Sequence, residues 1–288
     1  MATFSVHFDG DITKNHHVSV RVLGNTYTRM QAAIDRAFLM EKHGRVVKYE
    51  RLSREEYEET DFIAQYPREG GIILDAFKES GNRIIDRIYS TTNYIYERAV
   101  RGAFEEHQNI AQQLASRRDY VNRVGQRTPP YEQYFNERSA EWRDAYSNRS
   151  ILKEIAPLVN QVSRHDLENS TVELVLIGSR TNLPLHFDRS IARNFHRISA
   201  DKELGPPMRA HVWIRSLDIG GKTIKPNAKV YNFASGKEVV LHLFDQAGFD
   251  ALHPYHGIET GVEIYACPIM EAGGFDIEGG DLMFLRVI

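Results

Sequence analysis

The chain has 288 residues, of which 42% are hydrophobic and 26% are charged. This composition is ordinary for a globular protein, so we expect a sizeable core in one large domain or two. The formal net charge is −3. Overall charge therefore excludes a general attraction to nucleic acid or acidic membranes, and such binding would need a local patch.

Cysteine usage and apolar runs set the expected location. The single cysteine, Cys267, excludes an intrachain disulfide and suits a reducing compartment. No apolar run approaches the ~18 residues that cross a bilayer, and the first residues lack the basic and apolar regions of a secretory signal. We therefore expect a cytoplasmic protein with no membrane partner.

The first residues predict a hairpin followed by a helix. Apolar and polar residues alternate over residues 3–9 and again over 17–22, with a polar turn between them. Residues 25–43 then place apolar side chains at helical spacing, and Gly44 is suited to end that helix.

The remaining part of the first 80 residues predicts two more strands and a short helix. Residues 46–52 and 72–74 are the expected strands. Ser53 and Glu56 have the spacing of a capping box, which begins a helix. Residues 1–80 are therefore expected to form a small α/β unit.

The middle of the chain is expected to be helical. Residues 82–124 predict one long amphipathic helix, or two helices broken near Gly102. A single helix of about 40 residues would be about 60 Å long, which is longer than a small domain is wide. Such a helix would fold back or pair with a second copy, so a homo-oligomer is expected. Further helices are predicted over 131–147 and 150–165, after a break at 125–130.

The last part of the chain is expected to be rich in β-structure. Short alternating or apolar runs predict strands over residues 172–177, 209–217, 228–233, 238–244, 262–268 and 281–287. Helices are predicted over 189–196 and 244–252. The spacing of the strands, with glycine turns between them, is typical of a small sandwich or barrel.

These elements predict an α+β fold in three regions. A small N-terminal α/β unit covers residues 1–80, a long-helix region covers 81–168, and a C-terminal β-barrel or sandwich covers 169–288.

Common catalytic and cofactor motifs are absent from the sequence. There is no phosphate-binding glycine loop and no G-x-S-x-G nucleophile motif. Residues 220–223 (GGKT) lie between two expected strands, which predicts a turn. Cys267 lies in an apolar run without a nearby cation, as a structural cysteine would. No cofactor is expected, and enzymatic activity is left undecided with a preference against it.

One spacing resembles that of helical ribonucleases of the HEPN class, which carry an arginine and, four to six residues later, a histidine. Arg101 and His107 have this spacing on an expected helix. The resemblance implies that His107 acts as acid or base and that Arg101 stabilises phosphate charge. Gly102 departs from the polar residue that usually follows the arginine, and the resemblance covers the motif alone.

Two histidine pairs are candidates for a metal site. His186 and Asp188 would share a strand face, and His253 and His256 would meet across a turn. The alternative is that these are loop histidines in contact with water.

An arginine- and aromatic-rich segment, residues 117–149, is the candidate binding segment for nucleic acid or a protein partner. Arginine and aromatic side chains are typical of both kinds of surface. The residues predicted to contact the partner are Arg117, Arg118, Arg123, Arg127, Tyr131 and Trp142.

Three hypotheses for the function follow. The first is a non-enzymatic binding or assembly protein that oligomerises through its helices, for example an accessory or sensor component of a bacterial defence system. The second is a nuclease-like enzyme that uses Arg101 and His107 or the His/Asp metal site. The third is a nucleic-acid-binding protein that uses residues 117–149.

Overall fold

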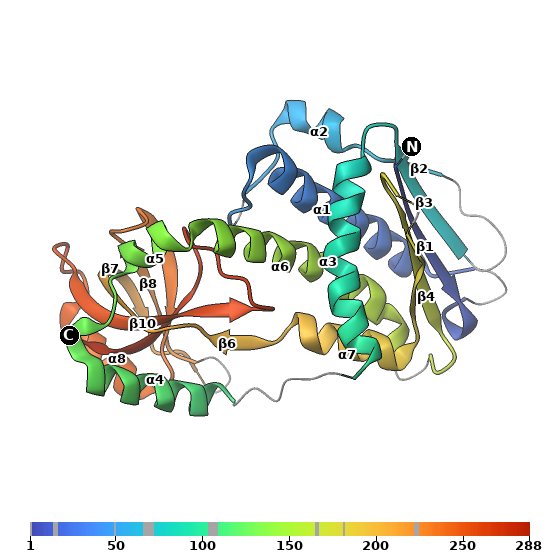
Figure 1. Ribbon diagram of the computed structural model, residues 1–288. Helices are drawn as coiled ribbons and strands as arrows, with labels where there is room; N and C mark the ends of the chain where they lie inside the picture. The colour runs from blue at the N-terminus through green and yellow to red at the C-terminus, as the bar shows by residue number, and fades with distance from the viewer. Residues whose placement is uncertain are drawn as a thin grey trace. The chain divides into compact units, whose positions relative to one another are not determined.

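The computed structural model describes residues 2–13, 17–48, 50–65, 72–102, 109–164, 167–180, 182–221 and 225–288. Helices and strands are both abundant among them, which confirms the α+β class (Figure 1). No helix in these ranges is long and apolar enough to span a bilayer.

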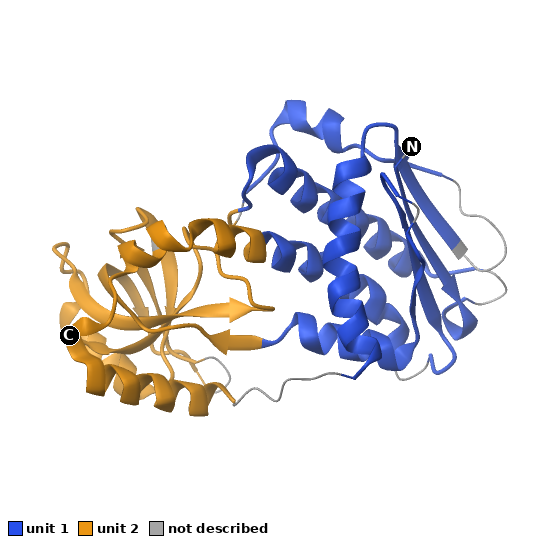
Figure 2. Cartoon of the chain, in the orientation of Figure 1, with its two compact units in different colours: residues 1–46, 50–105, 147–201 blue, residues 47–49, 106–146, 202–288 orange. Residues whose placement is uncertain are grey.

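The chain divides into two compact units (Figure 2). Unit 1 comprises residues 1–46, 50–105 and 147–201, and unit 2 comprises residues 47–49, 106–146 and 202–288. Each unit draws on all three regions expected from the sequence. Domain boundaries at residues 80 and 168 stay a prediction.

Unit 1 contains a five-stranded sheet in the order β2-β3-β1-β4-β5, in which all neighbouring strands are antiparallel. The strands are β1 (Ala2–Asp9), β2 (Ile63–Ala64), β3 (Ile72–Lys78), β4 (Thr171–Ile177) and β5 (Leu185–Phe187). Alternation in β1 buries Phe4, Val6 and Phe8 completely, as a strand with one covered face requires.

Helices supply the rest of the core of unit 1. The helix α3 (Asn82–Val100) contacts β1 and β4 and also packs against α1 (Val20–His43) and α7 (Arg189–Ser199). Burial of apolar residues on these helix faces is the main stabilising term.

The predicted strand over residues 17–22 is wrong, because α1 begins at Val20. Ser19 caps the helix by accepting a hydrogen bond from the Val22 backbone N–H at 3.2 Å. The cap and the 24-residue helix that follows it stabilise this segment more than strand pairing of six alternating residues would. The end of the helix was predicted correctly, since Gly44 adopts a left-handed conformation with φ 65°. The strand expected over 46–52 is also absent from the described residues of that stretch.

A short helix, α2 (Arg54–Thr60), starts at the predicted capping box. The Glu56 carboxylate accepts a hydrogen bond from the Ser53 backbone N–H at 2.7 Å and lies 2.7 Å from His43 Nε2. The hydrogen bond from Ser53, and then the one from His43, lower the pKa of Glu56 from 4.5 to about 2. The carboxylate therefore stabilises the fold fully above pH 4.5, and this contribution disappears as the pH falls towards 2.

We expect Glu56→Gln to lower the urea midpoint at neutral pH and to change it much less near pH 2. The reason is that the glutamine cannot titrate, whereas the native carboxylate loses its charge over this range. Glu59→Gln is the control, because the Glu59 side chain is 53% exposed. An equal difference in midpoint at both pH values would contradict this account of Glu56.

The helical middle region consists of several helices rather than one. The helix α3 ends at Val100, and α4 (Ile110–Val124) is a separate helix capped by Asn109. The apolar stripe of α3 lies inside unit 1, where Ile85, Ile88 and Ile95 are at most 4% exposed. The α3 part of the stripe that led us to expect a homo-oligomer is thus buried within unit 1, and oligomerisation stays a prediction.

The next two helices differ from the predicted bounds. The first, α5 (Tyr131–Glu137), is followed almost at once by α6 (Ser139–Val159). The helix α6 includes Pro157, close to its C-terminal end. Residues 139–146 of this helix belong to unit 2, and its remainder belongs to unit 1.

Unit 2 is built on a closed five-stranded barrel. Its strands are β7 (Met208–Asp218), β8 (Asn227–Asn232), β9 (Lys237–His242), β10 (Val262–Glu271) and β11 (Leu282–Val287). Antiparallel pairs join β7 to β8, β8 to β9, β10 to β11 and β10 to β7, and a parallel pair between β9 and β11 closes the barrel. A short strand, β6 (Lys202–Leu204), pairs with β10.

The connectivity of this barrel is a three-stranded meander, a helix, and two further strands. The helix is α8 (Gln246–Leu252), which lies between β9 and β10. The OB fold, a five-stranded Greek-key barrel, has a similar connectivity. The expectation of a barrel or sandwich is therefore resolved in favour of a barrel.

Candidate ligand-binding face of the barrel

The outer surface of the barrel carries different kinds of side chain on its two sides. On the side of β10 and β11, Tyr265 and Cys267 are buried beneath Leu114 and Val121 of α4. This burial raises the pKa of the Cys267 thiol to about 12, and the nearby Arg117 opposes the rise only in part. Cys267 is therefore a packing residue, as its apolar surroundings in the sequence predicted. The outer side of β7, β8 and β9 carries aromatic and charged side chains instead.

Four aromatic side chains follow one another on this outer side, and we call them the aromatic row: His211, Trp213, Tyr231 and Phe233. The rings of His211 and Phe233 are 4.6 Å apart, and those of Tyr231 and Phe233 are 5.5 Å apart. Trp213 is the cross-strand partner of Tyr231. Such contacts hold the rings in fixed orientations on the sheet.

The neighbouring loop fixes one end of the aromatic row. His211 Nε2 lies 2.9 Å from the carbonyl oxygen of Thr260. Gly261 has φ 77°, and a Cβ at this position would come within 2.7 Å of the Phe233 ring. Only glycine allows the chain to pass this close to the aromatic row. Phe233 nevertheless remains 42% exposed, so part of its ring faces the solvent.

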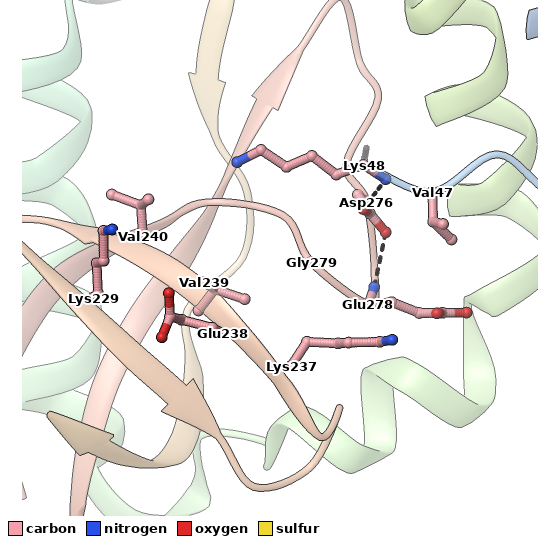
Figure 3. Close-up of a pocket in the computed structure, with 10 residues that line it drawn as sticks. All are labelled: Val47, Lys48, Lys229, Lys237, Glu238, Val239, Val240, Asp276, Glu278 and Gly279. Carbon is pink, nitrogen blue, oxygen red and sulfur yellow. Dashed lines mark hydrogen bonds between the residues drawn. The ribbon is translucent and has the colours of Figure 1, made fainter. Parts of the chain in front are cut away.

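A pocket of about 350 Å³ lies beside the aromatic row, and Figure 3 shows the residues that line it. We call it the lysine pocket, because Lys48, Lys229 and Lys237 reach it from three separate segments. The other lining residues are Val47, Glu238, Val239, Val240, Asp276, Glu278 and Gly279. Glu238 is the cross-strand partner of Tyr231, so the pocket and the aromatic row adjoin on β8 and β9.

The wall of the lysine pocket is held by Asp276, which is 4% exposed. Its carboxylate accepts hydrogen bonds from the backbone N–H groups of Lys48 at 2.7 Å and of Glu278 at 2.9 Å. The backbone N–H of Gly280 donates to the Asp276 carbonyl at 2.8 Å. These bonds join residues 47–48 to the turn between β10 and β11 and give the pocket a firm side.

Most charged groups around the pocket are paired. Lys48 Nζ donates to Asp281 at 2.6 Å, Arg215 is 3.0 Å from Glu238, and Arg143 is 3.9 Å from Glu278. Burial alone would raise the pKa of Asp281, but hydrogen bonds from His242 and Lys48 outweigh it and lower that pKa.

Lys229 and Lys237 differ from these residues. Within the described ranges, neither ammonium group has an ion pair. Figure 3 shows Lys237 extending towards the turn that contains Glu278, across the pocket. Lys229 and Lys237, which Figure 3 shows at opposite ends of the pocket, therefore each present a positive charge without an ion pair in the described part of the chain.

The four arginines predicted to bind a partner lie on α4 and just after it. Arg117 Nη2 donates to the Leu204 carbonyl at 2.9 Å and thus links α4 to β6. Arg118 is half-buried, whereas Arg123 and Arg127 are exposed. The exposed pair remains available to a partner, while Arg117 already has a structural contact.

The two aromatic residues predicted beside them lie in the core of unit 2. Tyr131 is 1% exposed, and its hydroxyl donates to the Ile277 carbonyl at 2.5 Å. Trp142 is 2% exposed and packs between Tyr134 and Phe275. Both rings contribute to packing in this structure and present almost no surface to a ligand.

The pair proposed for nuclease chemistry is only half described. Arg101 caps the C-terminus of α3, is 72% exposed in its side chain and lies 3.5 Å from Glu97. His107 lies outside the described residues, so the pairing of Arg101 with His107 remains a prediction.

The histidine pairs proposed for a metal site fall in different units. In unit 1, His186 is exposed on β5, and Asp188 caps α7 by accepting from the Ile191 backbone N–H at 2.7 Å. In unit 2, His253 lies beside Phe249 and begins a single 3-10 turn, and His256 ends this turn by donating its backbone N–H to the His253 carbonyl. Among the described residues, no group of three or more His, Cys, Asp or Glu side chains could hold a metal.

The residues of the aromatic row were not singled out from the sequence. Their signal is the two-residue period of a strand, since His211, Trp213 and Arg215 alternate with the buried Val212 and Ile214. A matching period places Lys229 and Tyr231 on the same side of β8. No protein-family model, curated protein or solved structure matches this chain.

Proposed function

We propose that this protein binds single-stranded nucleic acid on the outer side of β7, β8 and β9. The observation that carries the proposal is the position of the aromatic row next to the lysine pocket, on one side of one barrel. Proteins that bind single strands combine aromatic rings, on which bases stack, with cations that contact the backbone. His211, Trp213, Tyr231, Lys229 and Lys237 come from barrel strands, so these side chains need little ordering when a nucleic-acid strand binds.

The connectivity of the barrel also supports the outer side of β8 and β9 as the binding surface. In OB folds, the face of the second and third strands binds oligonucleotides or oligosaccharides, together with the loop between the fourth and fifth strands. Here those elements are β8, β9 and the turn that contains Asp276 and Glu278. The fold alone does not determine the ligand, so the argument for nucleic acid depends on the side chains.

The charge of this face predicts that the affinity for a single strand depends only weakly on the salt concentration. Each phosphate contact on a single strand contributes about −0.7 to the slope of log K against log salt. Lys229 and Lys237 would therefore give a slope of roughly −1 to −2. Stacking, which changes little with salt, would supply most of the affinity.

Titration of the full chain with labelled single-stranded DNA and RNA at several salt concentrations tests the proposal. We expect binding of single strands with this shallow slope, and weaker binding of the same sequence as a duplex, because paired bases cannot stack on protein rings. Absence of binding to both single strands at low salt would overturn the proposal. A preference for the duplex with a steep slope would overturn it too, since it would require more cations than this face carries.

Assembly through the helices is the other function that we expected. Its premise was an apolar stripe that the chain could not cover, whereas Ile85, Ile88 and Ile95 of α3 are buried in unit 1, and Leu114 and Val121 of α4 are buried in unit 2. Nucleic-acid binding is therefore the better-supported proposal, although on different residues from the segment 117–149.

A further inference from the structure

We propose that Arg215 contacts the phosphate backbone of the bound single strand, and that Glu238 holds Arg215 over the Trp213 ring until the strand binds. This inference rests on the function proposed above and adds a further residue that contacts the strand. In the free protein, the Arg215 guanidinium lies over the Trp213 ring, 5.3 Å from its centroid. Arg215 Nη1 also donates a hydrogen bond to Glu238 Oε2 at 3.0 Å. One arginine therefore joins an aromatic ring of β7 to a carboxylate of β9.

The position of Arg215 is set by an irregularity in the pairing of β7 with β8. Ile214 pairs with Val230 and Ser216 pairs with Lys229, so Arg215 is an extra residue without a partner on β8. Such β-bulges change the direction of a side chain and are frequent beside active sites. Here the bulge places a cation within the face that we propose for the strand.

The ion pair between Arg215 and Glu238 joins the two strands on either side of β8. Tyr231 is the residue of β8 that pairs with both Trp213 and Glu238. Because Arg215 contacts both of these partners, it spans the face at the level of Tyr231, within the aromatic row. A base that stacks on the Trp213 face beneath the guanidinium therefore requires Arg215 to move.

A phosphate group can take the place of Glu238 as the partner of Arg215. The side chains of Arg215 and Glu238 are 50% and 43% exposed, and ion pairs with this exposure contribute little to stability. A guanidinium presents a fork of N–H donors that fits a phosphate as well as a carboxylate. Exchange of one anion for the other therefore costs little, and it uncovers the Trp213 ring for a base.

The exchange agrees with the shallow salt slope expected for this face. Arg215 and Glu238 together carry no net charge, so the pair adds little to the attraction between the native protein and phosphate. Glutamine at position 238 would leave the charge of Arg215 uncompensated. We expect Glu238→Gln to bind a single strand about two- to fivefold more tightly, as the strength of an exposed ion pair implies. Its salt slope should be steeper by about 0.7, the value for one phosphate contact.

The test measures the affinity of labelled single-stranded DNA and RNA for three forms of the full chain at several salt concentrations. These forms are the native protein, Glu238→Gln and Arg215→Ala/Glu238→Gln. The double variant removes the whole ion pair, so we expect it to lose both the gain in affinity and the steeper slope. Glu59→Gln is the matched control, because it removes one carboxylate from an exposed ion pair in unit 1 and should bind as the native protein does.

Two results would overturn this inference and leave the proposed function intact. Native or weaker binding by a folded Glu238→Gln variant, checked by circular dichroism, would mean that Glu238 does not compete with the strand for Arg215. Equal tightening in Glu238→Gln and in Arg215→Ala/Glu238→Gln would mean that the carboxylate repels the strand without any part for Arg215. Absence of single-strand binding by all three forms would overturn the proposed function as well.

Discussion

Trp142→Ala is expected to lower the free energy of unfolding of unit 2 by about 3–5 kcal/mol, the usual cost of removing a buried aromatic ring. Trp142 is 2% exposed, its ring stacks on that of Tyr134 at 5.7 Å, and it lies nearly perpendicular to the Phe275 ring at 5.3 Å. Truncation to alanine would leave a cavity that the strands of the barrel cannot close, because their register holds them in place.

The loss can be measured within unit 2 itself. Cys267 is buried in that unit, and its raised pKa makes the folded thiol unreactive, so labelling by a thiol reagent reports opening of the barrel. We expect much faster labelling in Trp142→Ala and a smaller increase in Trp142→Phe, which keeps an aromatic ring. Native labelling rates in Trp142→Ala, together with weakened binding of nucleic acid, would instead favour the ligand contact that we inferred from the sequence.

The β-rich C-terminal half was predictable from the sequence, as a barrel or a sandwich, because its signals are local. Each of the five barrel strands alternates or forms an apolar run. The turn between β8 and β9 contains Gly236, which has φ 65° and so suits a tight hairpin turn. The second strand of the expected N-terminal hairpin, over residues 17–22, was wrong because alternation over so few residues competes with a cap, and Ser19 caps a helix of 24 residues.

The candidate site was less predictable, for two physical reasons. Composition cannot separate an aromatic ring in the core from one on the surface, so Tyr131 and Trp142 were expected to contact a partner although they fill the interior of unit 2. The lysine pocket also needs Lys48, which comes from a segment about 180 residues before Lys229 and belongs to unit 2, where it contacts Asp276 and Asp281. Contacts this distant leave no periodic pattern in the sequence.

Tyr231→Ala and Phe233→Ala should each weaken binding of a single strand by roughly 5- to 150-fold, since a stacked base contributes about 1–3 kcal/mol on alanine substitution. Phe233 is 42% exposed and Tyr231 half-exposed, so the folded protein should tolerate both changes. The measurement is fluorescence anisotropy with a labelled strand, with circular dichroism to confirm that each variant is folded.

Tyr94→Ala is the matched control, because Tyr94 is 65% exposed on α3 in unit 1 and lies far along the chain from the barrel strands. It should bind as the native protein does. Because stacking carries no net charge, the aromatic variants should change the affinity but keep the native salt slope, whereas Lys229→Ala/Lys237→Ala should make that slope shallower by about 1.4. Native affinity in both aromatic variants would contradict a stacking role for the aromatic row. A loss of salt dependence in those variants would contradict it equally, because it would mean that the rings act by placing the lysines.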